Sequence, residues 1–317
     1  MQLDISIIFN ETAQFCILLA IGYIAIKTRV FSSESLGTLS AYALKIAMPA
    51  MLVTKLPAAT TREMLAQTLP LLLALPFWYA LLAVGGVASA RVCKMPPNTA
   101  RVHIVQYTMG NIGVMGIILI IATLGDSSGI YMASVFFVDQ CILWTICEML
   151  SYPAEQKRGL NAASLKKVIK NPTIIGLFAA LFMILAGWRP DNLIVDVLSG
   201  LGGTAKYISM IFIGGTLATL DLKKLPFISG SLIIVVVKML VMPVFVFWLT
   251  GFFSGYLDIT ARLVLTLTTA LPSLFAMSIM ARSNGTDHEN ATMSVFVTTI
   301  SSMVTIPLVS LIVNRML

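Results

Sequence analysis

Two long apolar runs of this chain are interrupted, and the interruptions occupy comparable places in its two halves. The first run is broken between residues 110 and 116 by Gly110, Asn111, Gly113 and Gly116. The second is broken by the Leu-Pro-Ser sequence at residues 271–273. Interrupted apolar segments in matching places predict two related halves whose breaks meet around a binding site inside a membrane.

The composition around these breaks excludes a water-soluble fold. Hydrophobic residues make up 58% of the chain, charged residues 11%, and the mean hydropathy is +0.92. Such a chain cannot coat a soluble core with polar residues, so we predict an integral membrane protein. Long apolar runs with short turns favour helices over a barrel, which makes the expected fold all-α. At roughly 20 residues per crossing, ten spans are predicted: 4–27, 36–56, 64–90, 100–124, 128–152, 171–187, 193–220, 226–253, 258–282 and 289–313.

The basic residues of the loops predict an orientation. Ten spans place both termini on one side and divide the loops into two sets. One set holds thirteen Lys and Arg residues: Lys27, Arg29, Arg91, Lys94, Arg101, Lys157, Arg158, Lys166, Lys167, Lys170, Lys223, Lys224 and Arg282. The other holds five: Lys55, Arg62, Arg189, Arg262 and Arg315. The positive-inside rule then puts the first set of loops in the cytoplasm and both termini outside. The expected location is the inner membrane of a bacterial cell. The net charge of +7 is explained by contact with anionic membrane lipid, without nucleic acid.

The halves are expected to be inverted repeats. A polar connection at 153–170 separates residues 1–152 from residues 171–317, and each part holds five predicted spans. Because five is odd, the second part enters the membrane upside down relative to the first. The fourth span then corresponds to the ninth, and both contain a break. Non-helical backbone at that depth survives only against protein or a wet cavity.

Several motifs, in order along the chain, carry a resemblance to a known family. They are IGYIAIKTRVFSSESLGTLSAYALKIAMPAML across the first two spans, MGNIGVMGI in the fourth, KNPTIIGL opening the sixth, ALPSLFAMSIMARSNG in the ninth and TTISSMVTIPL in the tenth. Together they resemble the auxin efflux carrier family, which includes plant auxin exporters and bacterial malonate or malate permeases. The resemblance covers nearly the whole chain.

The resemblance implies two inverted five-helix repeats, with the fourth and ninth helices crossing at their breaks beside the substrate. Asn111 and Gly113 match the break of the fourth helix, and Pro272 matches that of the ninth. Pro49 matches a proline of the second helix. Two departures stand out, since the family usually has proline where this chain has Ile118 and Tyr207.

Four ionisable residues lie deep in predicted spans: Lys45, Lys206, Lys238 and Asp139. Each costs about 2.5–3.5 kcal/mol to insert, so each is expected to face a pathway or a partner. Lys45 and Lys206 fall near symmetry-related points beside the expected crossing. Asp139 could form a buried salt bridge with one lysine, or it could bind a coupling ion. Because three deep lysines outnumber one deep carboxylate, the excess positive charge is available to bind an anion.

Other polar groups near the breaks support an anionic ligand. Helix N-termini exposed by a break attract carboxylates, and Ser273 stands at such a terminus. His103 could titrate as a proton-coupling group or make an interfacial polar contact. Cys16, Cys93, Cys141 and Cys147 lack metal-type spacing and predict no metal site and no cofactor. The candidate substrate-binding residues are Asn111, Gly113, Pro272, Ser273, Lys45, Lys206 and Pro49, and the candidate ion-coupling residues are Asp139 and His103.

The leading functional hypothesis is a secondary active transporter of a small organic anion, a mono- or dicarboxylate, that works by alternating access at the crossing. The alternative is a proton- or sodium-coupled symporter resembling bile acid symporters, with Asp139 as the ion site. An intramembrane enzyme is disfavoured because clustered catalytic motifs are absent. A receptor without flux would need a signalling domain. The substrate, the direction of transport and the oligomeric state, a homodimer included, stay open.

Overall fold

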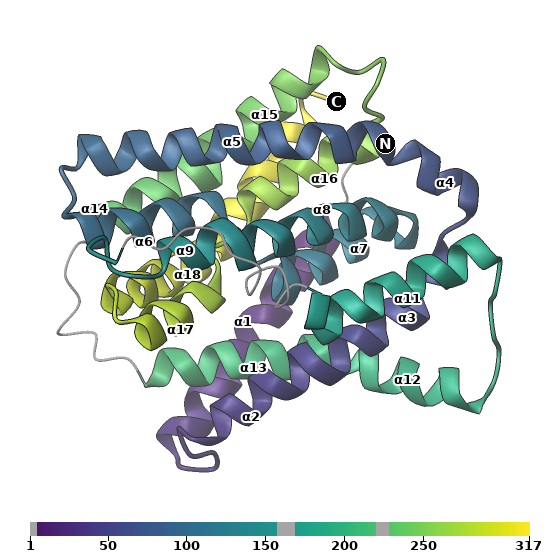
Figure 1. The fold of residues 1–317 in the computed structure, drawn as a ribbon, viewed down its shortest axis with the longest axis horizontal. Coiled ribbons are helices and arrows are strands. Elements are labelled where there is room, and N and C mark those ends of the chain that lie inside the picture. Colours follow the sequence, from purple (N-terminus) through teal and green to yellow (C-terminus); the bar gives the residue numbers. More distant parts are fainter. Residues whose placement is uncertain (1–4, 157–168, 220–227) are drawn as a thin grey trace.

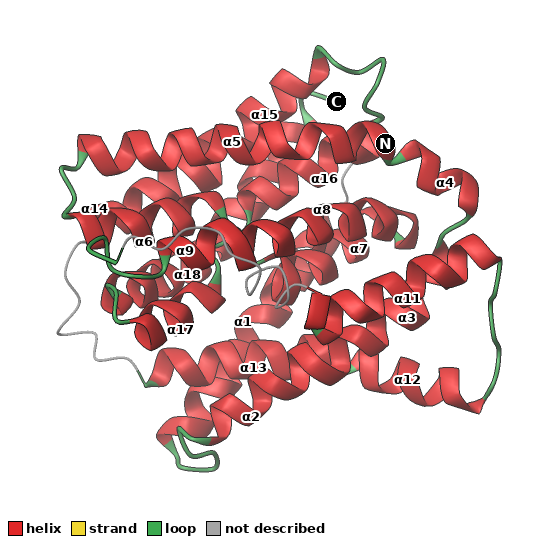
Figure 2. Cartoon of the chain, in the orientation of Figure 1, coloured by secondary structure: helices red, strands yellow, loops and turns green. Residues whose placement is uncertain are grey.

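The computed structural model describes residues 5–156, 169–219 and 228–317. Across these residues the chain is helical and contains no strand, only an isolated pair of bridged residues (Figure 2). The predicted connection at 153–170 lies largely outside the described residues. So do the ends of three predicted spans, at residue 4, at residue 220 and at 226–227.

Seven helices of the described chain are long and apolar enough to cross a membrane. They are α1 (Ile5–Lys27), α2 to α3 (Ser35–Tyr42, η1 at Ala43–Ala47 and Met48–Ala59), α4 to α5 (Arg62–Gln67 and Leu69–Val92), η3 to α9 (Asp126–Ser128, α8 at Gly129–Ile142, η4 at Leu143–Cys147 and Glu148–Leu150), α12 to α13 (Leu193–Gly203 and Ala205–Ala218), α14 to α15 (Ile228–Ile233, η6 at Ile234–Val241 and Met242–Gly251) and α18 (His288–Asn314). The chain is therefore a multi-pass membrane protein.

The other three predicted spans are shorter or divided. Apolar helix α11 (Pro172–Ala186) has 15 residues. The predicted span 100–124 is divided into α6 (Pro97–Thr108) and, after a gap, η2 (Ile112–Gly116) with α7 (Ile117–Leu124). The span 258–282 is likewise divided into α16 (Ile259–Ala270) and α17 (Phe275–Asn284). Both interruptions fall where the sequence predicts them.

The two interruptions contact each other directly. Gly110 and Ser273 form an antiparallel bridge, and the backbone N–H of Asn111 donates to the carbonyl oxygen of Pro272 at 2.8 Å. Pro272 cannot donate a backbone hydrogen bond and disfavours helical backbone at the preceding Leu271, which is extended with ψ 147. At Gly110 an added Cβ would lie 3.2 Å from Leu271 Cβ and 3.3 Å from the Thr268 carbonyl oxygen, so glycine permits the close approach.

The helices form two groups. In the first, α1 packs against α13, and α3 packs against both α11 and α12. In the second, α5 packs against α6, α15 against α16, and α18 against α6, α17 and η6. The first group lies toward the bottom and right of Figure 1 and the second toward the top and left, while α7 and α8 contact both. Each group therefore contains helices from both halves of the sequence.

Glycines bring α1 and α13 unusually close. A Cβ added at Gly214 would collide with the carbonyl oxygen of Leu19, and one added at Gly22 would collide with the carbonyl oxygen of Ile211. Small residues at such contacts allow membrane helices to pack backbone against backbone. The first group is thus held together partly by positions that only glycine can occupy.

Candidate functional site

A cavity of about 110 Å³ lies beside the contact between the two breaks. It is called the deep cavity below. Its walls come from both groups of helices and from α8. The polar residues that line it are Ser40, Asn111, Asp139, Gln140, Asn171, Thr173 and Ser209, and the apolar ones include Gly113, Phe136, Trp144, Phe212, Leu274 and Phe275. The cavity has the mixed lining that a small polar ligand requires.

Asn111 is the residue that links the helix break to the deep cavity. Its backbone is fixed by the hydrogen bond to Pro272, and its side chain is only 2% exposed. The side-chain Nδ2 has no hydrogen-bond partner among the described residues, and neither does Ser209 Oγ, which also lines the cavity. Buried polar atoms without partners are costly, so these two groups are suited to meet a ligand.

Asp139 lies on α8 with its carboxylate in the deep cavity wall. It accepts hydrogen bonds from Tyr79 Oη at 2.9 Å and from Gln140 Nε2 at 3.3 Å. The side chain is 1% exposed. The sequence left open a salt bridge between Asp139 and a deep lysine, and the structure does not form it. Lys206 and Lys238 each bind other groups, and Lys45 lines a different space.

Gln140 connects α8 to α11 across the cavity. Its Oε1 accepts from Asn171 Nδ2 and from Trp144 Nε1, each at 3.2 Å. Asn171 Oδ1 in turn accepts from the backbone N–H of Thr173 at 2.9 Å and caps the start of α11. Sequence reasoning missed Gln140, Asn171 and Ser209. The feature of the sequence that could have indicated them is their polarity within or beside apolar spans. Asn171 is also part of the KNPT motif.

A wider space, the vestibule, joins the deep cavity to one face of the molecule. It measures about 1010 Å³ and shares Ser40, Leu44, Phe212, Phe275 and Ile279 with the deep cavity. The ionisable residues that line it are Lys45, Arg282, His288 and Glu289, all of them exposed. The deep cavity therefore opens toward this face. Lys45 lies at its entrance, not inside it.

The Lys206 side chain does not lie at its predicted place beside the crossing. Its Nζ lies 2.6 Å from Glu11 Oε2 and 2.7 Å from Gln14 Oε1, and it covers the ring of Phe15 at 5.5 Å. These partners all belong to α1, and Lys206 lines neither the deep cavity nor the vestibule. Because an acid on a neighbouring helix holds its ammonium group, the structure does not place Lys206 where the predicted substrate-binding role requires it.

Pro272, Ser273 and Pro49 support the site without lining the deep cavity. The Ser273 hydroxyl donates to the carbonyl oxygen of Gln106 at 3.0 Å, and its backbone N–H donates to Thr298 Oγ1 at 3.0 Å. Pro49 packs against Gly176 of α11. These three residues therefore shape the backbone around the cavity in this structure, and their direct contact with substrate stays a prediction. Gly113 does line the cavity, as expected.

His103 lies away from the cavity. Its ring is fully buried, with Nε2 2.8 Å from Ser89 Oγ. The ring also lies 6.2 Å from that of Tyr107. It lines neither the deep cavity nor the vestibule, so the structure places this predicted ion-coupling residue in a buried contact between α6 and α5.

Lys238 is fully buried and donates to the carbonyl oxygen of Leu271. That carbonyl lies just beyond the last residue of α16, where the helix dipole is negative. The amine therefore satisfies a carbonyl that the break leaves without a helical partner. Lys238, on η6, therefore stabilises the break between α16 and α17.

Comparison with known proteins identifies the family of this chain. The family described as "Membrane transport protein" matches residues 7–310. The chain belongs to this family. The resemblance to the auxin efflux carriers is thereby confirmed. A protein of Rhizobium meliloti (strain 1021) named "Putative malonate transporter" is 22% identical over 293 residues, which cover 91% of this chain and 90% of the relative.

Proposed function

We propose that the protein is a secondary carrier of a small organic anion and that the deep cavity is its substrate site. The observation that carries the proposal is the Asn111 side chain, 2% exposed at the contact of two helix breaks with an unpaired Nδ2 beside the cavity. An amide N–H in that position is suited to a carboxylate oxygen. Leu274, Phe275 and Ala276 at the start of α17 also line the cavity, so the positive end of this helix is close to the ligand.

The proposed architecture is two inverted repeats, residues 1–152 and 171–317, joined by a cytoplasmic connection at 153–170. The grouping of helices supports it. The first group combines the first two spans of one half with the first two of the other, and the second group is built mainly from the last three of each. Alternating access would then arise from movement of one group against the other around the deep cavity.

The proposed substrate is a mono- or dicarboxylate. Lys45 and Arg282 line the entrance that leads to the deep cavity, and exposed cations at a cavity mouth raise the local concentration of anions. The name of the Rhizobium relative includes malonate, so malonate is the first compound to test.

Coupling to a proton or to sodium through Asp139 is a second candidate function, favoured by one observation. The Asp139 carboxylate stands in the same cavity as the proposed anion and contacts none of the deep lysines. Two negative charges in such a space repel strongly. A proton or a monovalent cation on Asp139 would remove that repulsion and couple its own gradient to anion movement.

The proposed location is the bacterial inner membrane, with the loops rich in Lys and Arg in the cytoplasm and both termini outside. Helix α11 offers a test because exposed Lys170 and Asp191 lie beyond its two ends. Cysteine at 191 should react in intact cells with an impermeant thiol reagent, whereas cysteine at 170 should react only after the membrane is opened. The reverse result would invert the orientation.

Uptake into proteoliposomes tests the carrier function itself. Purified full-length protein should take up radiolabelled malonate, and unlabelled mono- and dicarboxylates should compete in an order that defines the substrate. Empty liposomes give the background. If none of these anions is carried or competes, the proposed substrate class is wrong.

A further inference from the structure

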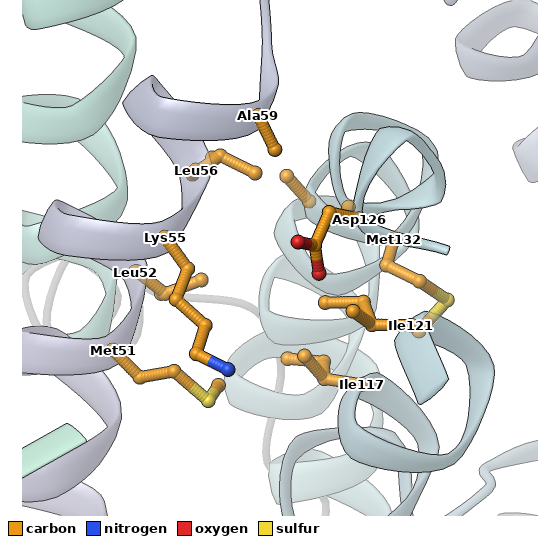
Figure 3. A pocket seen from close by; sticks show the side chains of 11 residues that line it. Met51, Leu52, Lys55, Leu56, Ala59, Ile117, Ile121, Asp126 and Met132 are labelled. Carbon is orange, nitrogen blue, oxygen red and sulfur yellow. The ribbon is translucent and has the colours of Figure 1, made fainter. Parts of the chain in front are cut away.

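A second pocket lies on the far side of the deep cavity from the vestibule. Eleven residues line it, and it measures about 20 Å³. It is called the α3–α8 pocket below. Its walls are the C-terminal part of α3, the helix α7, the start of α8 and Asp126 of η3 (Figure 3). Since α3 belongs to the first group of helices and α7 and α8 contact both groups, the pocket lies along the boundary between the groups.

Two helical segments lead from the deep cavity to this pocket. On α8, Phe136 lines the deep cavity, and Met132 and Ala133, one turn away, line the pocket. On the segment from η2 to α7, Gly113 lines the cavity and Ile117 lines the pocket. Residues three or four apart share a face of a helix. The α3–α8 pocket therefore follows the deep cavity along the same faces of these helices.

Buried apolar side chains lie along these helices between the two spaces. A Cβ added at Gly113 would lie 3.3 Å from Phe136 Cε2 and 3.7 Å from Met48 Cε. Met48 is 1% exposed and Phe136 3% exposed. Met132 and Ile117, which line the pocket, are also buried. A barrier of this kind excludes ions while closed, and methionine allows it to rearrange.

The pocket carries opposite charges at its mouth. Lys55 of α3 and Asp126 of η3 point into it from facing walls (Figure 3), and both residues are exposed. Lys45 lines the vestibule ten residues earlier on the same continuous helix, Ser35–Ala59. Ten helical residues span roughly 15 Å. One helix thus presents a lysine at the vestibule and another at the α3–α8 pocket.

The two mouths lie toward opposite ends of the helices. Helix α17, which borders the vestibule, is at the left of Figure 1, whereas α4, which follows α3, is at the right. We propose that the α3–α8 pocket is the closed second mouth of the transport path, sealed by Met48 and Phe136. In this mouth Lys55 attracts the carboxylate substrate, as Lys45 does at the vestibule, and Asp126 opposes that attraction. This inference rests on the proposed carrier function and identifies its second entrance.

Sided transport measurements test the role of Lys55. Initial uptake of radiolabelled malonate is measured in right-side-out and in inverted membrane vesicles that contain the full-length chain. K55Q should raise the KM by about three- to tenfold in vesicles of one orientation, and K45Q should do so in the other. D126N should lower the KM in the orientation that K55Q affects. Equal effects of K55Q in both orientations, or none in either, would overturn the inference.

Cysteine accessibility tests the path without relying on malonate transport. In A133C the thiol would line the pocket on α8, and it should react with an impermeant thiol reagent applied to the face opposite the vestibule. A180C is the matched control, since Ala180 is also buried but lines neither the α3–α8 pocket nor the deep cavity. The unsubstituted chain gives the labelling of its native cysteines.

The two readouts separate the inference from the proposed function. Labelling of A133C from the opposite face without any malonate transport would support the path and contradict the proposed substrate. Malonate transport with A133C labelled only from the vestibule face, or no faster than A180C, would support the substrate and overturn the second mouth.

Discussion

The backbone N–H of Asn111 donates to the carbonyl oxygen of Pro272 at 2.8 Å and so joins the two helix breaks directly. One hydrogen bond at this point satisfies a donor and an acceptor that the interrupted helices leave without internal partners. It also fixes the orientation of the Asn111 side chain beside the deep cavity. The hydrogen bond that joins the two breaks therefore also positions a residue of the candidate site.

Asn111→Ala should abolish most anion binding while leaving the fold stable. The Nδ2 atom of Asn111 has no partner within residues 5–156, 169–219 and 228–317, so its removal breaks no hydrogen bond there. A hydrogen bond to a charged ligand is worth about 1.5–3 kcal/mol, which predicts a KM for malonate raised about tenfold or more. Asn290→Ala is the control, since Asn290 is also 2% exposed but lies outside the deep cavity. Equal KM values for Asn111→Ala and the wild type would remove Asn111 from the site.

The breaks were predictable because their causes are local. Pro272 lacks a backbone donor and restricts the residue before it, and Gly110 permits a close approach, so each break follows from its own few residues. The apolar runs similarly fixed the positions of the helices. The contact between Asn111 and Pro272 was expected from the pairing of the halves and from family resemblance.

The partners of the buried charges were not predictable, because they come from distant parts of the chain. Lys206 meets Glu11, 195 positions away in sequence, and Asp139 meets Tyr79. A hydropathy pattern gives the depth of a charge but not the direction of its side chain around the helix. For the same reason Gln140 and Ser209 could not be distinguished from polar residues that contact other helices.

Asp139→Asn should separate ion coupling from anion binding. If a proton or a cation on Asp139 permits the anion to enter, an uncharged amide keeps the site permissive but removes the ion. We therefore expect exchange of internal for external malonate to persist, while accumulation driven by an imposed proton or sodium gradient is lost.

Asp191→Asn is the matched control, because Asp191 is exposed in the loop after α11. It should accumulate malonate as the wild type does. Undiminished accumulation by Asp139→Asn under both gradients would exclude Asp139 as the coupling site.

Lys206 and Glu11 should contribute to stability and not to transport. Their side chains are 15% and 16% exposed, so the loss of either partner leaves a partly buried charge and should cost about 1–2 kcal/mol. Lys206→Met should lower the melting temperature in detergent, and Lys206→Met with Glu11→Gln should recover part of it. Malonate uptake per folded molecule should match the wild type in both. A large loss of uptake without a change in melting temperature would instead return Lys206 to the site.

Gly214→Ala should destabilise the first group of helices more than substitution of an exposed glycine inside a helix. An added methyl group at Gly214 would collide with the carbonyl oxygen of Leu19 on α1, and backbone cannot move aside as a side chain can. Overpacking of this kind costs about 1–3 kcal/mol. Gly200→Ala on α12 is the control, since nothing lies within 4 Å of its added Cβ, and alanine is the better helix former there. Melting curves of the two variants in the same detergent should therefore move in opposite directions, and a Gly214→Ala variant as stable as the wild type would show that α1 and α13 do not need this close contact.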